Sequence, residues 1–265
     1  DLMSRITAGD DVARIEAALD VAAAALEPFT PGAIEARMKS GDDPVTAADL
    51  AVNEALLAML PRPGEGWFSE ETADDAARLG CERVWIVDPV DGTREFVAGI
   101  PEWCVSIGLV IDGTPVAGGI LNPVAGHRIV GSVDDGVTLN GEASGTTSAD
   151  DLRGALVLAS RSEVKRGEWQ PFLTTPISIR NMGSVAYKLG CVAAGMADAT
   201  WTLVPKNEWD VAAGAALVAA GGGAVFGPDG EDIRFNQADP LLPGFVAVTG
   251  GLETEVRTFL ADYRP

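Results

Sequence analysis

The chain reads WIVDPVDGT at residues 85–93, and no other stretch of it is as informative. An apolar run typical of a strand, Val84–Val87, is followed by two aspartates, Asp88 and Asp91, three positions apart. Such a turn would aim both carboxylates at one point just beyond the end of the strand. Gly92 then opens an expected helix, whose first backbone N–H groups are free to hold an anion.

These residue types point to a metal ion and a phosphate. Hard cations such as magnesium take oxygen ligands and usually recruit substrate phosphates to complete their shell. Two carboxylates beside an anion-binding helix start therefore indicate metal-assisted phosphate chemistry. Taken alone, the same residues could equally be a turn former (Asp88) and a helix N-cap (Asp91), which is a common use of aspartate.

Composition narrows the class of protein. The 265 residues are 47% hydrophobic and 22% charged, as in ordinary soluble globular proteins, and could form one large domain or two medium ones. The net charge of −20 argues against a nucleic-acid polymer as partner, because such a binder needs a basic face. No apolar run approaches the roughly 20 residues of a membrane span, so no membrane partner is expected.

The cysteines and the single histidine exclude several kinds of site. Cys81, Cys104 and Cys191 form neither a zinc pattern nor a disulfide framework, which predicts a reducing compartment and a cytoplasmic protein. His127 alone cannot supply a histidine-based zinc site, and a Ser-His-Asp triad is also disfavoured. We expect it to be a surface turn residue.

The order of elements predicts two halves of different character. The pattern of apolar residues, caps and turn residues predicts helices at 10–27, 47–60, 183–196, 211–220 and 254–263, and strands at 66–69, 84–87, 105–111, 115–122, 127–132, 137–139, 156–159, 225–226 and 244–248. The first half is rich in hairpins, as in an antiparallel α+β layer, and the second alternates strands and helices, as in an α/β layer. The stretch 141–151 is the best linker, which predicts an N-terminal domain at 1–145 and a C-terminal domain at 146–265.

Further acidic residues fall at strand ends and helix starts, where the backbone holds a carboxylate rigidly. Asp49 lies at the start of the second helix, Glu70 and Glu71 follow the strand at 66–69, and Asp210 opens a later helix. Each could separately be a helix-dipole residue or part of a solvated loop. Together with the 85–93 stretch, they fall at places that a metal site could use.

Four motifs occur in one order along the chain: PVTAAD at 44–49, SEE at 69–71, WIVDPVDGT with Phe96, and WDVAAG at 209–214. In this order they resemble the inositol monophosphatase superfamily of magnesium-dependent, lithium-sensitive phosphatases, over roughly residues 10–250. The resemblance implies a layered α-β-α-β-α sandwich and a homodimer. The α+β first half and the α/β second half agree with that fold.

The resemblance also implies a site with two to three magnesium ions. The implied ligands are Glu70, Asp88 and the Val90 carbonyl for the first ion, Asp88, Asp91 and Asp210 for the second, and Glu70 near Asp49 for a third, weaker one. The ions would activate a water molecule that attacks a small phosphate ester. Phosphoryl transfer of this kind needs no protein nucleophile.

Two catalytic tasks are implied for the residues around Thr93. Thr93, together with Asp49 or Glu70, would orient the attacking water. The backbone N–H groups of Gly92 and Thr93 would hold the phosphate.

The sequence indicates the substrate less clearly than it indicates the metal site. GSVAYK at 183–188 resembles 3'(2'),5'-bisphosphate nucleotidases of the CysQ type, which carry Gly-Ser followed closely by Lys. Gly183, Ser184 and Lys188 would then bind substrate, because a lysine suits a second phosphate as a point charge. The alternative is that Lys188 is an exposed helix residue and Gly183-Ser184 its cap.

A departure from the inositol phosphatases points the same way. Members that hydrolyse inositol phosphates carry a glutamate several residues before the Trp-Asp motif, and residues 200–204 contain no acid. Glu208, directly before Trp209, could replace that substrate-binding glutamate, although its spacing differs. Against this, WDVAAG and GILNP at 119–123 fit inositol phosphatases equally well.

We therefore expect a bisphosphate nucleotidase, with an inositol-1-monophosphatase or a histidinol- or sugar-phosphate phosphatase as alternatives. A non-catalytic regulator on the same fold is the expectation from a different class. The filled carboxylate positions count against it.

Overall fold

The computed structural model describes residues 2–38, 44–74, 76–261 and 263, with side chains from residue 10 onward. The helices are α1 (Leu2–Leu26), α2 (Ala47–Met59), α3 (Thr93–Ala98), α4 (Arg161–Arg166), α5 (Val185–Ala193), α6 (Glu208–Ala220) and α7 (Glu253–Ala261). The larger sheet runs β3 (Gly66–Ser69), β4 (Arg83–Asp91), β5 (Cys104–Ile111), β6 (Thr114–Asn122), β7 (His127–Ser132), β8 (Gly136–Leu139) and β9 (Glu142–Ser144).

A second sheet lies in the C-terminal half. Its strand order is β11 (Ser178–Met182), β10 (Leu156–Ser160), β12 (Ala199–Thr202), β16 (Phe245–Thr249) and β14 (Gly223–Phe226). Two small pairs complete the strands: β1 (Arg37–Met38) with β2 (Pro44–Val45), and β13 (Lys206–Asn207) with β15 (Leu241–Leu242).

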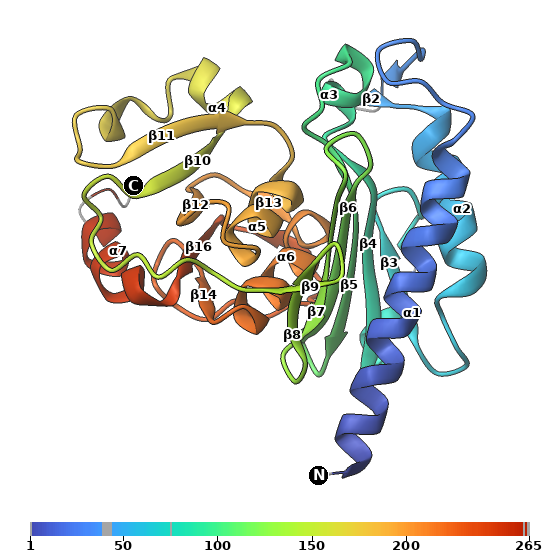
Figure 1. Ribbon diagram of the computed structural model, residues 1–265. Coiled ribbons are helices and arrows are strands. Elements are labelled where there is room, and N and C mark those ends of the chain that lie inside the picture. Colours follow the sequence, from blue (N-terminus) through green and yellow to red (C-terminus); the bar gives the residue numbers. More distant parts are fainter. Residues whose placement is uncertain (1, 39–43, 75, 262, 264–265) are drawn as a thin grey trace.

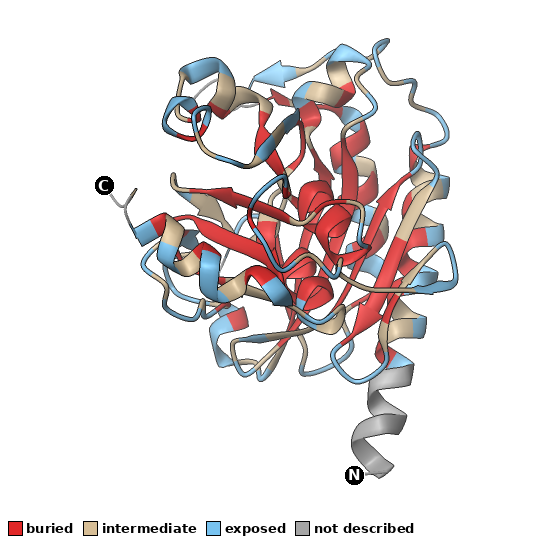
Figure 2. Cartoon of the chain, turned by 60° about the vertical axis from the view of Figure 1, so that its left-hand side comes forward, coloured by how far each residue is buried: buried red, intermediate tan, exposed pale blue. Residues whose placement is uncertain are grey.

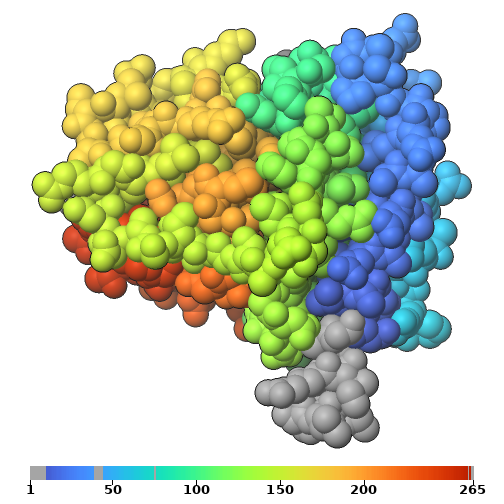
Figure 3. Space-filling view, in the orientation of Figure 1, coloured from blue at the N-terminus to red at the C-terminus, as the bar shows by residue number. Residues whose placement is uncertain are grey.

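The elements stack in five layers, as Figure 1 shows. Helices α1 and α2 cover one face of the larger sheet, and α5 and α6 fill the space between the two sheets. Helices α4 and α7 pack on the outer side of the smaller sheet. This is the expected α-β-α-β-α sandwich. In the space-filling view, the N-terminal half of the chain, coloured blue to green, lies on the right, and the C-terminal half, coloured yellow to red, lies on the left (Figure 3).

The larger sheet is a meander, because β4 to β9 pair antiparallel with their neighbours along the chain, while β3 pairs parallel with β4. The hairpin predicted at Asp112-Gly113 joins β5 to β6. Both turn residues have positive φ, 49° and 76°. This conformation twists a two-residue turn in the same sense as its strands.

Helix α6 is the central element, buried between the sheets (Figure 2). It packs directly on the backbone of the larger sheet because glycines face it. A Cβ atom added to Gly108 would lie 2.8 Å from Ala213 N, and one added to Gly118 would lie 2.5 Å from Ala213 O. The alanine-rich face of α6 thus brings its first turn, with Asp210, close to the end of β4.

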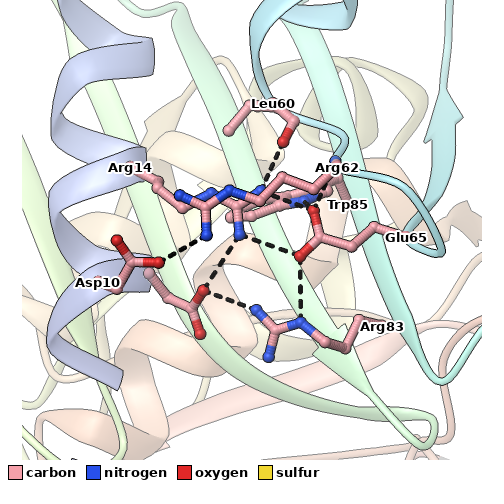
Figure 4. Close-up of polar contacts among 8 residues, drawn as sticks. Asp10, Arg14, Leu60, Arg62, Glu65, Arg83 and Trp85 are labelled. Atoms are coloured by element: carbon pink, nitrogen blue, oxygen red, sulfur yellow. Dashed lines mark hydrogen bonds and ion pairs between the residues drawn. The ribbon is translucent and has the colours of Figure 1, made fainter. Parts of the chain in front are cut away.

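A buried ion-pair network fastens α1 to the edge of the larger sheet (Figure 4). Glu65 accepts hydrogen bonds from Arg14 at 2.6 Å and 3.0 Å, from Arg83 Nε at 3.1 Å and from Trp85 Nε1 at 2.9 Å. Arg83 also donates to Asp11 at 2.6 Å. The network fixes the helix layer against β4, the strand that carries Asp88 and Asp91.

Several predicted boundaries were wrong. Helix α1 begins at residue 2 rather than 10, α6 begins at Glu208 rather than at 211, and α5 covers only 185–193 of the predicted 183–196. The predicted linker at 141–151 contains β9 at its start. Among the described residues, no helix combines the length and the apolar character needed to cross a membrane.

Candidate active site

Asp88 and Asp91 both lie on β4, so the prediction that the strand ends at Val87 was wrong. In the pairing with β5, Asp88 faces Ser106 and Asp91 faces Cys104. Three steps along β4 therefore match two steps along β5, which is a β-bulge. Residues three apart in a regular strand point to opposite faces, and the extra residue re-aims one of the two side chains. The bulge thus brings both carboxylates to one place.

Asp210 joins them from the first turn of α6. The carboxylate oxygens of Asp88, Asp91 and Asp210 lie within 4.8 Å of one another. Asp210 also accepts a hydrogen bond from the backbone N–H of Asn207 at 3.1 Å, as part of a capping box. The capping interpretation and the ligand interpretation of this aspartate are therefore compatible, because one carboxylate has two oxygens.

The electrostatics of this cluster call for cations. Burial raises the pKa of Asp88 well above its usual range, and the carboxylates of Glu70, Asp91 and Asp210 raise it further. Burial likewise raises the pKa of Asp210, with Asp91 and Glu70 adding to the effect. Three acids this close cannot all be ionised without a compensating positive charge. An all-oxygen donor set of this kind fits a hard divalent cation such as magnesium.

Glu70 lines the same cavity, directly after β3. Its backbone N–H donates to the Val87 carbonyl at 3.3 Å, which holds the loop against β4. Among the described residues, the tight carboxylate group contains three aspartates and does not include Glu70. Glu70 therefore borders the cluster rather than lying within it.

The hydroxyl of Thr93 lies between two acceptors. Its Oγ1 is 3.1 Å from Asp49 Oδ1 and 2.9 Å from the Val90 carbonyl oxygen. Asp49 is fully buried at the start of α2, where its other oxygen accepts from the backbone N–H and hydroxyl of Thr46. Thr93 and Val90 line the cavity, whereas Asp49 lies behind Thr93. Asp49 can thus influence a molecule in the cavity through its hydrogen bond with Thr93.

Gly92 separates β4 from α3 with a φ of 92°. It lines the cavity, and a Cβ atom at this position would lie 3.0 Å from the Glu102 carbonyl oxygen. Both the positive φ and the close approach favour glycine. Asp91 is not the N-cap of α3, because Gly92 holds that position and Asp91 has other partners.

The partners of Asp91 come from the substrate side of the cavity. Its Oδ2 accepts from the Ser184 hydroxyl and from the Ala186 backbone N–H, each at 2.6 Å. Ser184 is also the N-cap of α5, since its Oγ accepts from the Tyr187 N–H at 3.0 Å. Gly183 lines the cavity next to it. The end of β4 and the start of α5 are therefore directly joined.

Lys188 is buried, with 2% of its surface exposed, so its interpretation as an exposed helix residue was wrong. Its Nζ donates to the Ser184 carbonyl at 2.9 Å, and the side chain lines the cavity. Burial lowers the pKa of Lys188, while Asp91 and Glu163 raise it. A second lysine, Lys206, lines the same cavity and is paired with the buried Glu163 at 3.1 Å.

Glu208 lies outside the cavity, which does not support the predicted contact with substrate. Its side chain is fully buried, and its two oxygens accept from the backbone N–H groups of Asn236 at 2.7 Å and Gln237 at 2.9 Å. On the other side of this turn, Arg78 donates to Asn236 Oδ1 at 2.8 Å and to the Gln237 carbonyl at 3.0 Å. Glu208 therefore holds a turn in place rather than facing the site.

His127 is also not a plain surface turn residue. It begins β7, is half-buried, and its Nδ1 lies 2.8 Å from the Tyr187 hydroxyl of α5. This contact links the larger sheet to the helix layer.

Four charged residues that line the cavity are absent from the predicted site: Arg94, Glu95, Arg161 and Lys206. Glu95 and Arg161 fall in stretches that share the nucleotidase pattern, DGTREF at 91–96 and ASRS at 159–162, and that pattern was the available signal. Lys206 precedes α6 in a short polar strand, and its place in the cavity depends on a partner 43 positions earlier in the chain, so no local pattern marks it.

The cavity has a volume of about 210 Å³. Residues at or next to the N-terminal ends of α3, α4, α5 and α6 line it. Helix N-termini carry partial positive charge and favour anions. The arrangement therefore offers carboxylates for cations on one part of the wall, and lysines and helix ends for a phosphate on another.

Comparison with known proteins identifies this arrangement. The family model described as "Inositol monophosphatase family" matches residues 6–260. The chain belongs to the inositol monophosphatase family. It is therefore a metal-dependent phosphomonoesterase, and Asp88, Asp91 and Asp210 are an acidic cluster that could hold a metal ion.

Two curated relatives carry different names. The inositol monophosphatase of Mesembryanthemum crystallinum is 34% identical over 76% of this chain and 80% of its own length. The 3'-phosphoadenosine 5'-phosphate phosphatase of Mycobacterium leprae is 37% identical over 76% of each. Among solved structures, the inositol monophosphatase of Zymomonas mobilis is 28% identical and superposes with a TM-score of 0.78, over 96% of this chain and 98% of that one.

Proposed function

We propose that this chain is a magnesium-dependent 3'(2'),5'-bisphosphate nucleotidase. The observation that favours it is the buried Lys188 in the wall of the cavity that holds the aspartate cluster. A lysine is almost never buried without a partner, and Nζ has three donors of which one is used by the Ser184 carbonyl. The remaining donors suit a phosphate that is not being hydrolysed.

A second observation favours the same substrate class. Glu208, the candidate for the hydroxyl-binding glutamate of inositol phosphatases, is occupied by two backbone N–H groups outside the cavity. An inositol ring would then lack that contact. The relative from Mycobacterium leprae, named as a phosphatase of a bisphosphate nucleotide, is also among the more similar curated proteins.

The metal assignment completes the proposal. Two to three magnesium ions would be held by Glu70, Asp88, the Val90 carbonyl, Asp91 and Asp210, with Asp49 near the weakest. When bound, such ions supply Lewis-acid activation of a water molecule and neutralise charge on the phosphate.

The protein's own residues position the reacting groups. The Thr93 hydroxyl, with Asp49 behind it or with Glu70, orients the attacking water. The N–H groups of Gly92 and Thr93 bind the phosphate that is hydrolysed. Ser184 keeps Asp91 in place through its 2.6 Å hydrogen bond.

The main alternative is an inositol-1-monophosphatase, which the relative from Mesembryanthemum crystallinum favours. A histidinol- or sugar-phosphate phosphatase is a further one. A non-catalytic regulator is disfavoured, because a chain without catalysis has no need for three adjacent buried or half-buried aspartates. We further propose a lithium-sensitive, cytoplasmic homodimer, with a domain boundary at residues 145/146 between the two sheets.

The test compares phosphate release from adenosine 3',5'-bisphosphate and from inositol 1-phosphate, in magnesium, by the wild type and by Lys188→Met. The proposal predicts faster release from the bisphosphate, and a loss of about 100-fold in kcat/KM for that substrate in the variant, since one charged contact contributes about 1.5–3 kcal/mol. Faster release from inositol 1-phosphate by the wild type would overturn it.

A further inference from the structure

Glu95 is a cavity residue to which the proposed metal and phosphate chemistry gives no task. It lies in the first turn of α3, two positions after Thr93, and lines the cavity with Arg161, Gly183 and Lys188. It is half-buried, and burial raises the pKa of its carboxyl group. A carboxylate inside an anion-binding cavity repels the phosphate, so the presence of Glu95 there needs an explanation.

The chain leaves space for this side chain at one specific position. A Cβ atom added to Gly183 would lie 2.5 Å from both Cγ and Cδ of Glu95, and 2.7 Å from its Oε1. The end of the Glu95 side chain therefore rests on the backbone of Gly183. This contact fixes the carboxyl group beside the start of α5, where Ser184 and Lys188 lie.

The neighbouring cations have partners other than the Glu95 carboxyl group. Arg161 is paired with Glu102, which also accepts from the Gly183 N–H at 2.8 Å. Lys188 donates to the Ser184 carbonyl. Among the described residues, the Glu95 carboxyl group makes no ion pair with Arg161 or Lys188, although both cations lower its pKa. Its acceptor capacity is therefore available to a molecule in the cavity.

We propose that Glu95 is a specificity-determining residue that accepts a hydrogen bond from a hydroxyl group of the substrate. An ionised carboxylate only accepts hydrogen bonds, and it repels phosphate oxygens, so it selects the hydroxyl-bearing part of a phosphate ester. This inference rests on the proposed function for the identity of the group. In adenosine 3',5'-bisphosphate, the hydroxyl is the ribose 2'-hydroxyl, next to the 3'-phosphate.

The experiment is a cycle of two enzymes and two substrates. We compare kcat/KM for adenosine 3',5'-bisphosphate and for its 2'-deoxy analogue, with the wild type and with Glu95→Ala. The wild type should prefer the ribose substrate by about 10- to 100-fold, the range for a hydrogen bond to a charged group. Glu95→Ala should retain a preference of less than about threefold, mainly through a slower reaction of the ribose substrate.

Matched variants separate this role from a structural one. Glu54→Ala removes an exposed glutamate on α2 and should leave the substrate preference unchanged. If Glu95→Ala does not fold by circular dichroism, Glu95→Gln gives the same readout, because it keeps the shape and loses the charge. It should then show a preference reduced at least severalfold from that of the wild type.

Two results would overturn the inference: equal rates for both substrates with the wild type, or an undiminished preference in Glu95→Ala. If adenosine 3',5'-bisphosphate is not hydrolysed and inositol 1-phosphate is, the proposed nucleotidase function fails separately. The role of Glu95 is then tested with inositol 1-phosphate and its 2-deoxy and 6-deoxy analogues. A preference for the hydroxylated substrate that survives in Glu95→Ala would overturn the inference there as well.

Discussion

The Thr93 hydroxyl lies 3.1 Å from Asp49 Oδ1, and Asp49 is fully buried behind it. Both neighbours of this hydroxyl, Asp49 Oδ1 and the Val90 carbonyl oxygen, are acceptors. The Thr93 hydroxyl therefore donates its proton to one of these two acceptors, and its lone pairs can accept a hydrogen bond from a water molecule in the cavity. This orientation suits a residue that holds an attacking water.

Thr93→Val should lower kcat by about 10² to 10⁴, the usual contribution of a positioned proton acceptor, with a smaller change in KM. Steady-state phosphate release in saturating magnesium measures both constants. Thr93→Ser keeps the hydroxyl and should remain within about tenfold of the wild type by the same reasoning. A kcat of Thr93→Val that stays close to that of the wild type would contradict this role of the hydroxyl.

The turn between Glu208 and Arg78 gives a stability prediction. In the wild type, two backbone N–H groups donate to the two oxygens of the Glu208 carboxylate. The amide in Glu208→Gln has one oxygen and one NH₂ group instead, so one buried backbone donor loses its acceptor. The free energy of unfolding should fall by about 1–3 kcal/mol. Urea unfolding followed by circular dichroism measures it, with Glu231→Gln in an exposed turn as the control. No change in Glu208→Gln would mean that this turn is held mainly by Arg78.

The network around Glu65 predicts a dependence of stability on pH. Burial alone would raise the pKa of Glu65, but hydrogen bonds from Arg14, Trp85 and Arg83 hold it far below its usual range. A depressed pKa in the folded state stabilises the protein above the unfolded pKa, and this contribution is lost as pH falls below it. At neutral pH, Glu65→Gln should cost about 2–3 kcal/mol.

This difference between wild type and Glu65→Gln should stay constant from neutral pH to about pH 5, because Glu65 is ionised in both states above the usual glutamate pKa of about 4.3. It should shrink below that pH by up to about 1.4 kcal/mol per pH unit. Denaturant unfolding at a series of pH values measures it. A difference that does not shrink in acid would mean that the charge of Glu65 contributes nothing.

The local motifs predicted the fold and the three aspartates that the structure brings together, because caps, turns and strand ends are local events. Asp49 and Asp210 occupy helix first turns, as expected, and Glu70 follows β3 directly. The bulge in β4 was not predictable from the apolar run, since Pro89 and two aspartates read as the end of a strand. Only pairing with β5 shows that the strand continues to Asp91.

The substrate side was less predictable because its contacts join distant parts of the chain. Ser184 reaches Asp91 across 93 positions, and Lys206 is held by Glu163. Glu208 was misplaced because an acid before Trp209 looks like a site residue in sequence. Its partners lie in a turn 28 and 29 positions later, which no local pattern reveals.

The central claim is that Asp88, Asp91 and Asp210 bind magnesium, and calorimetric titration of magnesium into wild type and Asp91→Asn tests it most directly. An asparagine carbonyl can still accept from Ser184 and Ala186, so the variant should melt like the wild type. Its magnesium affinity should fall by at least about 10- to 100-fold, the cost of losing even an outer partner of a metal site, and phosphate release should cease. Unchanged magnesium binding and near-full activity in Asp91→Asn would contradict the account.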